Sequence, residues 1–229
     1  SNSLTNAQGL ANLMHGSSSG QGLTDANTYV TALNNFESSG VMVWSAGNDV
    51  GESDASAMAG LPELFPDLGE AWIVANVVQY TGDSDLSDAT SSEFTLKGNK
   101  CGSTAEYCLS VDGYDVYAAT YVNSGTSEYN SSRISYGSSW SAPMVSGGVA
   151  LMAQAFPNHT SEQLVDRILA SANNVWFTPE GNTTFTTHGN SVKHGYHSTW
   201  GHGIPDFYAA LSPITSDGNP ASMSLYTSS

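Results

Sequence analysis

The sequence of 229 residues predicts a single α/β domain with a mainly parallel sheet between helices. Two short apolar runs, residues 41–44 and 72–78, are typical of parallel strands that are covered on both faces. A third stretch, residues 145–156, is apolar nearly all round and rich in small residues. Such a composition indicates a helix packed against neighbours on several sides.

The first half of the chain predicts a helix followed by a strand and a polar turn. A helix is expected from Thr24 or Asp25 to Gly40, and residues 41–44 then form the first buried strand. The polar turn at residues 46–49 follows at the carboxyl end of that strand. Because ligands of open parallel sheets bind at the strand carboxyl ends, this turn is a candidate binding position.

A serine turn opens the buried helix. The glycine and two serines of residues 137–139 lead into it, and Pro143 lies in its first turn, where a missing N–H costs no helical hydrogen bond. A serine at this position lies beside the free N–H groups and the positive end of the helix dipole, where an oxyanion is stabilised. On spacing alone, the alternative is that Ser138 or Ser139 only caps a core helix.

The later segments predict smaller elements. Residues 116–121 read as a strand that enters a hairpin-like loop, and a second helix begins after Thr160 or Ser161 as its N-cap. Residues 200–211 form a closing element, and the polar tail of residues 213–229 is expected to be a linker. We therefore expect the folded part to span residues 1–212.

Composition excludes several classes of partner. The chain has 21 acidic residues against five basic ones, a formal charge of -16, so it would be repelled by nucleic acid and anionic membranes. No apolar run is long enough to span a bilayer.

Cys101 and Cys108 are either free thiols or, in an exported protein, a small-loop disulfide. Because Ser1 follows no initiator Met, we expect a processed or excerpted chain.

The acidic segment between residues 81 and 100 does not match a known calcium loop. An EF-hand loop needs glycine at its sixth position and a glutamate ligand at its twelfth. Counting from Asp83, these positions are Asp88 and Phe94. We interpret this segment as a solvated loop. No cofactor or metal is required by the sequence, although structural calcium stays open.

Residues 137–147, GSSWSAPMVSG, resemble the nucleophile motif of the subtilisin-like serine peptidases, G-[TS]-S-x-[SA]-A-P-x-[VS]-[SA]-G. The resemblance implies a three-layer fold, hydrolysis of peptide bonds through an acyl-enzyme, and Ser139 as nucleophile. The strand ending in AGN, residues 46–48, resembles the family signature for the asparagine that donates to the oxyanion, which implies this role for Asn48. By the same match, Ala46 and Gly47 line the substrate groove.

Further segments carry the same resemblance. GLPELFP, residues 60–66, is similar to the family's G-x-P-x-x-x-P, which makes Gly60 the floor of a substrate pocket. CGSTAEYC, residues 101–108, resembles a segment of the autotransporter-type members and implies the Cys101–Cys108 disulfide. The resemblance implies a secreted or cell-surface peptidase that acts on polypeptides.

The catalytic acid and base of the family are missing from the matched segments. In the subtilisin-like order, Asp and His precede the oxyanion asparagine and the serine, but only His15 lies upstream, and its context does not match. Ser3 and Leu4 match a later strand end that forms a groove wall, with Thr5 replacing the family's glycine. We therefore expect the C-terminal portion of a catalytic domain, completed by an N-terminal fragment of the same precursor. Expressed alone, this portion should be poorly folded and inactive.

Two alternatives stay open. One is a different serine hydrolase whose triad lies within this chain, using Ser139 and Asp206 with a histidine from its C-terminal part. The candidate histidines are His188, His194, His197 and His202. The other alternative is a non-catalytic peptidase-like domain used for binding.

Overall fold

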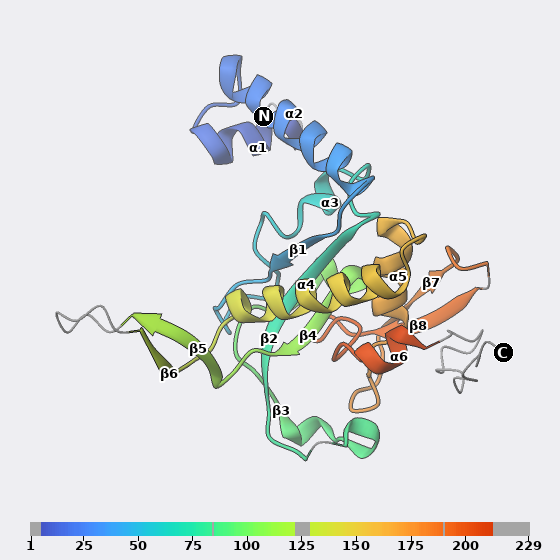
Figure 1. The fold of residues 1–229 in the computed structure, drawn as a ribbon. Helices are drawn as coiled ribbons and strands as arrows, with labels where there is room; N and C mark the ends of the chain where they lie inside the picture. The colour runs from blue at the N-terminus through green and yellow to red at the C-terminus, as the bar shows by residue number, and fades with distance from the viewer. Residues whose placement is uncertain (1–5, 84, 122–128, 190, 213–229) are drawn as a thin grey trace.

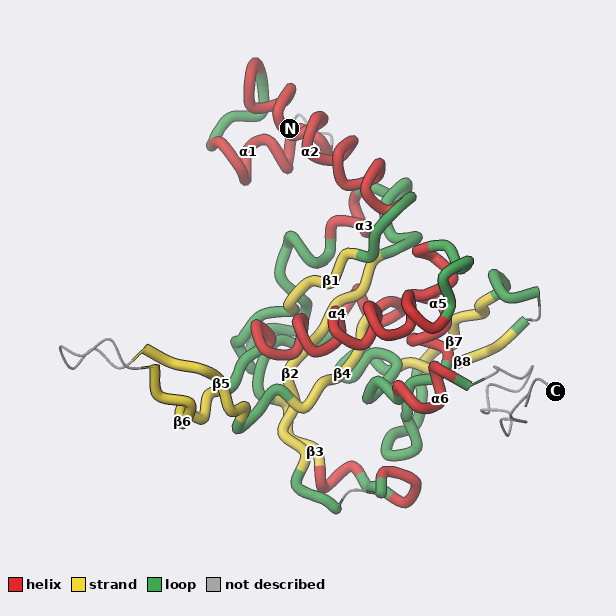
Figure 2. The backbone as a smooth tube through the Cα atoms, viewed as in Figure 1, coloured by secondary structure: helices red, strands yellow, loops and turns green. Residues whose placement is uncertain are grey.

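The computed structural model describes residues 6–83, 85–121, 129–189 and 191–212. A four-stranded sheet forms its centre, with β1 (Met42–Ser45), β2 (Trp72–Tyr80), β3 (Phe94–Leu96) and β4 (Cys108–Asp112) (Figures 1 and 2). β2 pairs in parallel with both β1 and β4, whereas β3 pairs antiparallel with residues 78–80 at the end of β2. The predicted, mainly parallel sheet is confirmed.

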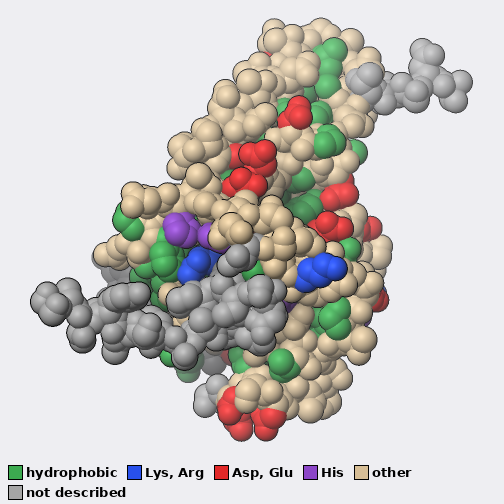
Figure 3. All heavy atoms as spheres, turned by 90° about the vertical axis from the view of Figure 1, so that its right-hand side faces the viewer, with side chains coloured by type: hydrophobic (Ala, Val, Ile, Leu, Met, Phe, Trp, Pro, Cys, Tyr) green, Lys and Arg blue, Asp and Glu red, His purple; other side chains and the backbone are tan. Residues whose placement is uncertain are grey.

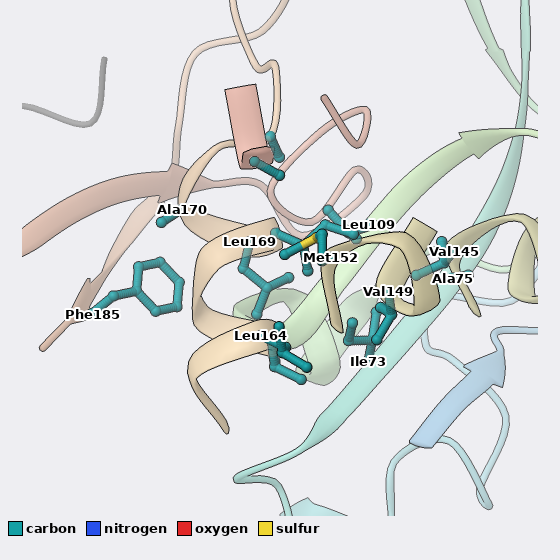
Figure 4. Close-up of a cluster of buried hydrophobic side chains, with 14 of the residues drawn as sticks. Ile73, Ala75, Leu109, Val145, Val149, Met152, Leu164, Leu169, Ala170 and Phe185 are labelled. Carbon is teal, nitrogen blue, oxygen red and sulfur yellow. The ribbon is translucent and has the colours of Figure 1, made fainter. Parts of the chain in front are cut away.

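Helices cover one face of this sheet. α4 (Ser138–Ala155) crosses it, and α5 (Ser161–Ala170) packs beside α4 (Figure 1). Val149 and Met152 of α4 lie against the side chain of Ile73 and its neighbours in the buried cluster of Figure 4. Because side chains alternate along a strand, Trp72 and Val74 point to the opposite face, where they pack with Leu61 of α3 (Leu61–Leu64) in a second cluster. The result is a three-layer α/β fold.

Two helices precede the sheet and project from it (Figure 1). α1 (Asn6–His15) was not expected, and α2 (Gly20–Glu37) begins four residues earlier than the predicted start at Thr24. The sequence prediction was wrong here because the apolar pattern of residues 6–15 is weak. α1 is stabilised by contact with α2, since Leu10 and Ala11 are buried in the same cluster as Ala26.

β1 also differs from its prediction. We expected a strand buried on both faces, but only Met42 is fully buried, while Val43, Trp44 and Ser45 are half-buried. The reason is its place in the sheet: among the described residues, β1 pairs with β2 on one side and with no strand on the other.

The remaining elements surround the core. β5 (Val116–Tyr121) and β6 (Tyr129–Ser135) form a hairpin that extends from the body, and β7 (Gly181–Phe185) pairs with β8 (Val192–Tyr196) near α5 (Figure 1). α6 (Phe207–Leu211) closes the described chain. Three short 3-10 helices complete it, η1 (Leu86–Asp88), η2 (Ser91–Glu93) and η3 (Gly102–Tyr107). Residues 213–229, the predicted linker, lie outside the described residues.

The helix caps show why α4 and α5 begin where they do. Thr160 caps α5: its Oγ1 accepts from the Gln163 N–H at 3.2 Å, and the Gln163 side chain accepts from the Thr160 N–H at 3.0 Å. This reciprocal pair settles the choice between Thr160 and Ser161 in favour of Thr160. α4 begins at Ser138, directly after Gly137. Pro143 is the sixth residue of α4 and lies inside the helix, so the prediction that it occupies the first turn was wrong, and its missing N–H removes the usual helical bond to the Ser139 carbonyl.

Cys101 and Cys108 form the expected disulfide and enclose η3 between them. Acidic side chains are scattered over the face seen in Figure 3, among few basic ones, in keeping with the strong negative charge of the chain. No helix in the described part of the chain is both long and apolar enough to cross a membrane.

Candidate active site

The sheet brings three separate segments to one edge. β1 ends at Ser45, opposite Ala75, and β3 pairs with β2 only from Val78 onward. The turn after β1 and the segment after β3 therefore meet: the Asn99 N–H donates to the Gly47 carbonyl at 3.2 Å. The serine turn that opens α4 reaches the same place from β6.

Gly137 allows the serine turn to approach the β1 turn closely. Its φ of 150° lies in a region that other residues rarely adopt, and its N–H donates to the Gly113 carbonyl at 3.1 Å. A Cβ added at Gly137 would lie 3.3 Å from the Asn48 amide. The glycine of the serine motif is thus required both by its backbone conformation and by the closeness of Asn48.

Ser138 connects the two turns through hydrogen bonds. Asn48 Oδ1 accepts from the Ser138 N–H at 2.7 Å and from the Ser138 hydroxyl at 2.9 Å. The same hydroxyl oxygen accepts from the Gly47 N–H at 3.1 Å. Ser138 is buried, with 1 % of its surface exposed, so these bonds are shielded from water. They fix which end of the Asn48 amide faces Ser138.

Ser139 follows on the open side of this contact. It is the second residue of α4 and is exposed, in contrast to buried Ser138. Because Asn48 Oδ1 is occupied by Ser138, the amide's Nδ2 group is directed elsewhere, and within the described residues it has no acceptor. Of the first N–H groups of α4, that of Ser138 donates to Asn48 Oδ1 at 2.7 Å and that of Trp140 donates to the Gly137 carbonyl at 2.9 Å. The Ser139 N–H between them is left, together with the Asn48 Nδ2 group, to donate to an anionic oxygen.

The two predicted catalytic residues, Ser139 and Asn48, therefore lie at one place although 91 positions separate them. Of the predicted groove residues, Ala46 is fully buried, and its N–H donates to the Ala75 carbonyl at 2.9 Å. Gly60 is open enough to admit a Cβ, which would lie 3.7 Å from Thr104. Ser3 and Leu4 lie outside the described residues, so their groove role stays a prediction.

No hydrogen bond joins Ser139 to any of the six histidines, all of which lie in the described parts of the chain. Each histidine has other neighbours. His15 faces Asp25, His188 contacts the Gln163 carbonyl at 2.9 Å, and His197 faces Glu180. His159 stacks on Phe156, while His194 and His202 contact each other.

Asp206 does not complete a triad with these histidines. Its carboxylate accepts from the Ala209 N–H at 2.8 Å and caps α6. The described structure therefore gives no support to a triad within this chain.

His202, one of the candidate triad histidines, is fully buried and packs in the core. Its ring nitrogens contact His194 Nδ1 and the Glu106 carbonyl, each at 2.9 Å. Burial, with a smaller contribution from the neighbouring His194, lowers the pKa of His202 to about 3. The ring is neutral at physiological pH, and its position in the core separates it from Ser139.

The acidic loop uses its carboxylates on its own backbone. Asp83 accepts from the Asp85 N–H at 2.8 Å, and Asp85 accepts from the Ser87 N–H at 2.9 Å. Interaction with the Ser87 side chain, and then with its backbone N–H, lowers the pKa of Asp85. Over the described ranges, no three His, Cys, Asp or Glu side chains gather into a group that could hold a metal ion.

Two residues of the site were not predicted from the sequence. Ser138 was considered only as a cap, although its hydroxyl holds the Asn48 amide. The [TS] position of the motif was the available signal for this. Asn99 was not singled out at all, and nothing in its local sequence marks it, because its partners Gly47, Asp49 and Asp54 are about 50 positions away.

Fold and site together define a three-layer α/β protein with a serine turn at the carboxyl edge of a mainly parallel sheet. Residues 1–203 match the family model described as the subtilase family. This chain belongs to the subtilase family.

Individual relatives are longer than this chain. It is 29% identical over 139 residues to the "Extracellular serine protease" of Serratia marcescens, a match that covers 54% of this chain and 12% of that protein. Among solved structures, the protease domain of PatA matches with a TM-score of 0.50 and 15% identity, over 84% of this chain and 53% of that one. Fervidolysin from Fervidobacterium pennivorans, a keratinolytic enzyme related to subtilisin, matches with a TM-score of 0.51 and 20% identity, over 86% and 25%. Both likenesses show the fold.

Proposed function

We propose that this chain supplies the nucleophile and the side-chain oxyanion donor of a secreted or cell-surface serine endopeptidase. The observation that carries the proposal is the pair of hydrogen bonds from Ser138 to Asn48 Oδ1, at 2.7 and 2.9 Å. They place Asn48 beside the serine turn with its Nδ2 group free to donate. Membership of the subtilase family and the name of the Serratia marcescens relative support the same activity.

The chemistry follows from these groups. Ser139 Oγ attacks the carbonyl carbon of a peptide bond, and its proton passes to a base. The Asn48 Nδ2 group and the Ser139 N–H donate to the negative oxygen of the tetrahedral intermediate. Expulsion of the amine, which takes up a proton from the base, leaves an acyl-enzyme that water then hydrolyses. Ala46, Gly47 and Gly60, with Ser3 and Leu4, would line the groove for the polypeptide substrate.

The base and its orienting carboxylate would come from an N-terminal fragment of the same precursor. The support is geometric: in the described structure each histidine of this chain contacts groups other than Ser139. There is also room for such a fragment beside β1, which has no strand on its outer edge in the described chain. A groove of about 210 Å³ lies there between β1 and α4, lined by small residues that include Ser146, Ala150 and Ala153.

Labelling with a fluorophosphonate probe tests the proposal on the precursor or on its two reassociated fragments. We expect labelling that Ser139→Ala abolishes and that the control variant Gln154→Ala retains, because Gln154 lies on the same helix, is exposed and does not line the groove beside β1. Single changes His188→Gln and His197→Gln should leave labelling intact.

Three results would contradict the proposal. An unlabelled assembly that still binds polypeptides would indicate a non-catalytic binding domain. Loss of labelling in a histidine variant that remains folded would indicate a triad within this chain. Strong labelling of the isolated chain would show that no N-terminal fragment is needed.

A further inference from the structure

We propose that Asn99 is a positioning residue that holds the oxyanion-donating turn in its working conformation. The inference rests on the proposed function of Asn48. Asn99 comes three residues after β3, and only 7 % of its surface is exposed. It is hydrogen-bonded to the turn that carries Asn48.

Asn99 is bonded to the residues on both sides of Asn48. Its backbone N–H donates to the Gly47 carbonyl at 3.2 Å, and its side-chain Oδ1 accepts from the Asp49 N–H at 2.9 Å. These two bonds bracket Asn48, so the peptide groups before and after it are both restrained. Ser138 thus holds the side chain of Asn48, while Asn99 holds the backbone before and after it.

The chain packs closely around Asn99 at two glycines. A Cβ at Gly47, whose φ is 121°, would lie 2.4 Å from Asn99 Oδ1. A Cβ at Gly98 would lie 2.3 Å from the Gly47 carbonyl oxygen and 3.3 Å from Asn48 Cα. The two glycines thus allow the segment after β3 to lie directly against the turn, which makes Asn99 part of its support.

The other end of the Asn99 amide specifies asparagine rather than aspartate. Its Nδ2 donates to the Asp54 carbonyl at 2.9 Å, and the Asp54 carboxylate accepts from the Ser103 N–H at 2.7 Å. Asn99 therefore links the turn through Asp54 to the disulfide-bonded loop of η3. An aspartate at 99 would keep the acceptor for Asp49 but face the Asp54 carbonyl with a second oxygen, which repels it.

The test is a double-mutant cycle in the assembled enzyme, with an internally quenched peptide as substrate. We expect Asn99→Ala to lower kcat about 10- to 100-fold with KM changed less than threefold, since small misplacement of a catalytic group costs up to about 100-fold. Asn99→Asp should show a smaller loss in the same direction. In an Asn48→Ala background, Asn99→Ala should lower kcat less than threefold, because the donor that it positions is already absent.

Asn76→Ala is the matched control, since Asn76 is fully buried and its Nδ2 also donates to a distant carbonyl, that of Thr199 at 2.9 Å. Its effect on kcat should be the same in both backgrounds. Full additivity of Asn99→Ala and Asn48→Ala would overturn the inference and assign Asn99 a general structural role. If Asn99→Ala does not fold, Asn99→Asp is used in the same cycle. An assembly that keeps its activity in Ser139→Ala would instead overturn the proposed function, so the two failures are distinguishable.

Discussion

Replacing Ser138 by alanine should weaken catalysis and stability together, each by an amount that the contacts predict. The change removes the hydroxyl bond to Asn48 Oδ1 at 2.9 Å and the acceptor of the Gly47 N–H at 3.1 Å. The Ser138 N–H still donates to Asn48 Oδ1 at 2.7 Å, so the amide is loosened rather than released. Loss of one hydrogen bond of about 1 kcal/mol from the positioned donor corresponds to roughly a tenfold or smaller fall in kcat.

This loss should be smaller than that of Asn48→Ala, for which about 10²–10³ in kcat is expected, a range measured in subtilisin, another member of the family. The half-buried Gly47 N–H, left without an acceptor, should lower the free energy of unfolding by about 1 kcal/mol. Both quantities are measured on the assembled enzyme, by peptide hydrolysis and by thermal unfolding.

Ser138→Thr is the control for this prediction, since threonine keeps the hydroxyl and also occurs in the family motif. Its kcat should stay within about threefold of that of the unchanged enzyme, because the bonds of the hydroxyl persist. Equal losses in Ser138→Thr and Ser138→Ala would refute the reasoning. So would a Ser138→Ala enzyme with unchanged kcat and reduced stability, because the hydroxyl would then hold the fold but not the donor.

Three further predictions concern stability, each measured by unfolding of the assembled protein. His202 is buried and neutral, with a pKa of about 3 in the folded chain, whereas its pKa in the unfolded chain is about 6.5. Below pH 6.5 the unfolded chain therefore binds a proton that the folded chain does not. The free energy of unfolding should fall as the pH drops, by about 2 kcal/mol at pH 5. Burial raises the pKa of Asp112, which changes stability with pH in the opposite direction. The measurement is therefore a comparison: the free energy of unfolding of His202→Gln should depend less on pH than that of the unchanged protein. Parallel curves of unfolding free energy against pH would contradict the prediction. Gly148→Ala should lower the free energy of unfolding by about 1–3 kcal/mol, since its Cβ would lie 1.8 Å from the Phe207 ring. Gly147→Ala has open space around it and should stabilise α4 by about 0.5–1 kcal/mol. A change of the same sign in both variants would contradict the packing argument. Reducing the disulfide should cost roughly 2–3 kcal/mol, and an unchanged melting temperature under reductant would show that η3 is held by other contacts.

The elements that could be predicted from the sequence are those whose signal is local. β2, α4 and α5 were predicted because their apolar patterns and caps lie within a few residues of each other, as for Thr160 and Gln163. α1 was not predicted, since its stability depends on contact with α2. The partial exposure of β1 was mispredicted for a similar reason: an apolar run shows that a strand can be buried, but only the sheet order shows what covers it.

The same distinction applies to the candidate site. The sequence by itself determined the family, and through its motifs it nominated Ser139 as nucleophile and Asn48 as its oxyanion partner. Only the tertiary structure decided that Ser138 holds the Asn48 amide and that Asn99 bonds to the backbone before and after Asn48. The physical reason is range: a motif records residues that are neighbours along the chain, whereas the orientation of a hydrogen-bond donor depends on groups that folding brings together across about 50 to 90 positions.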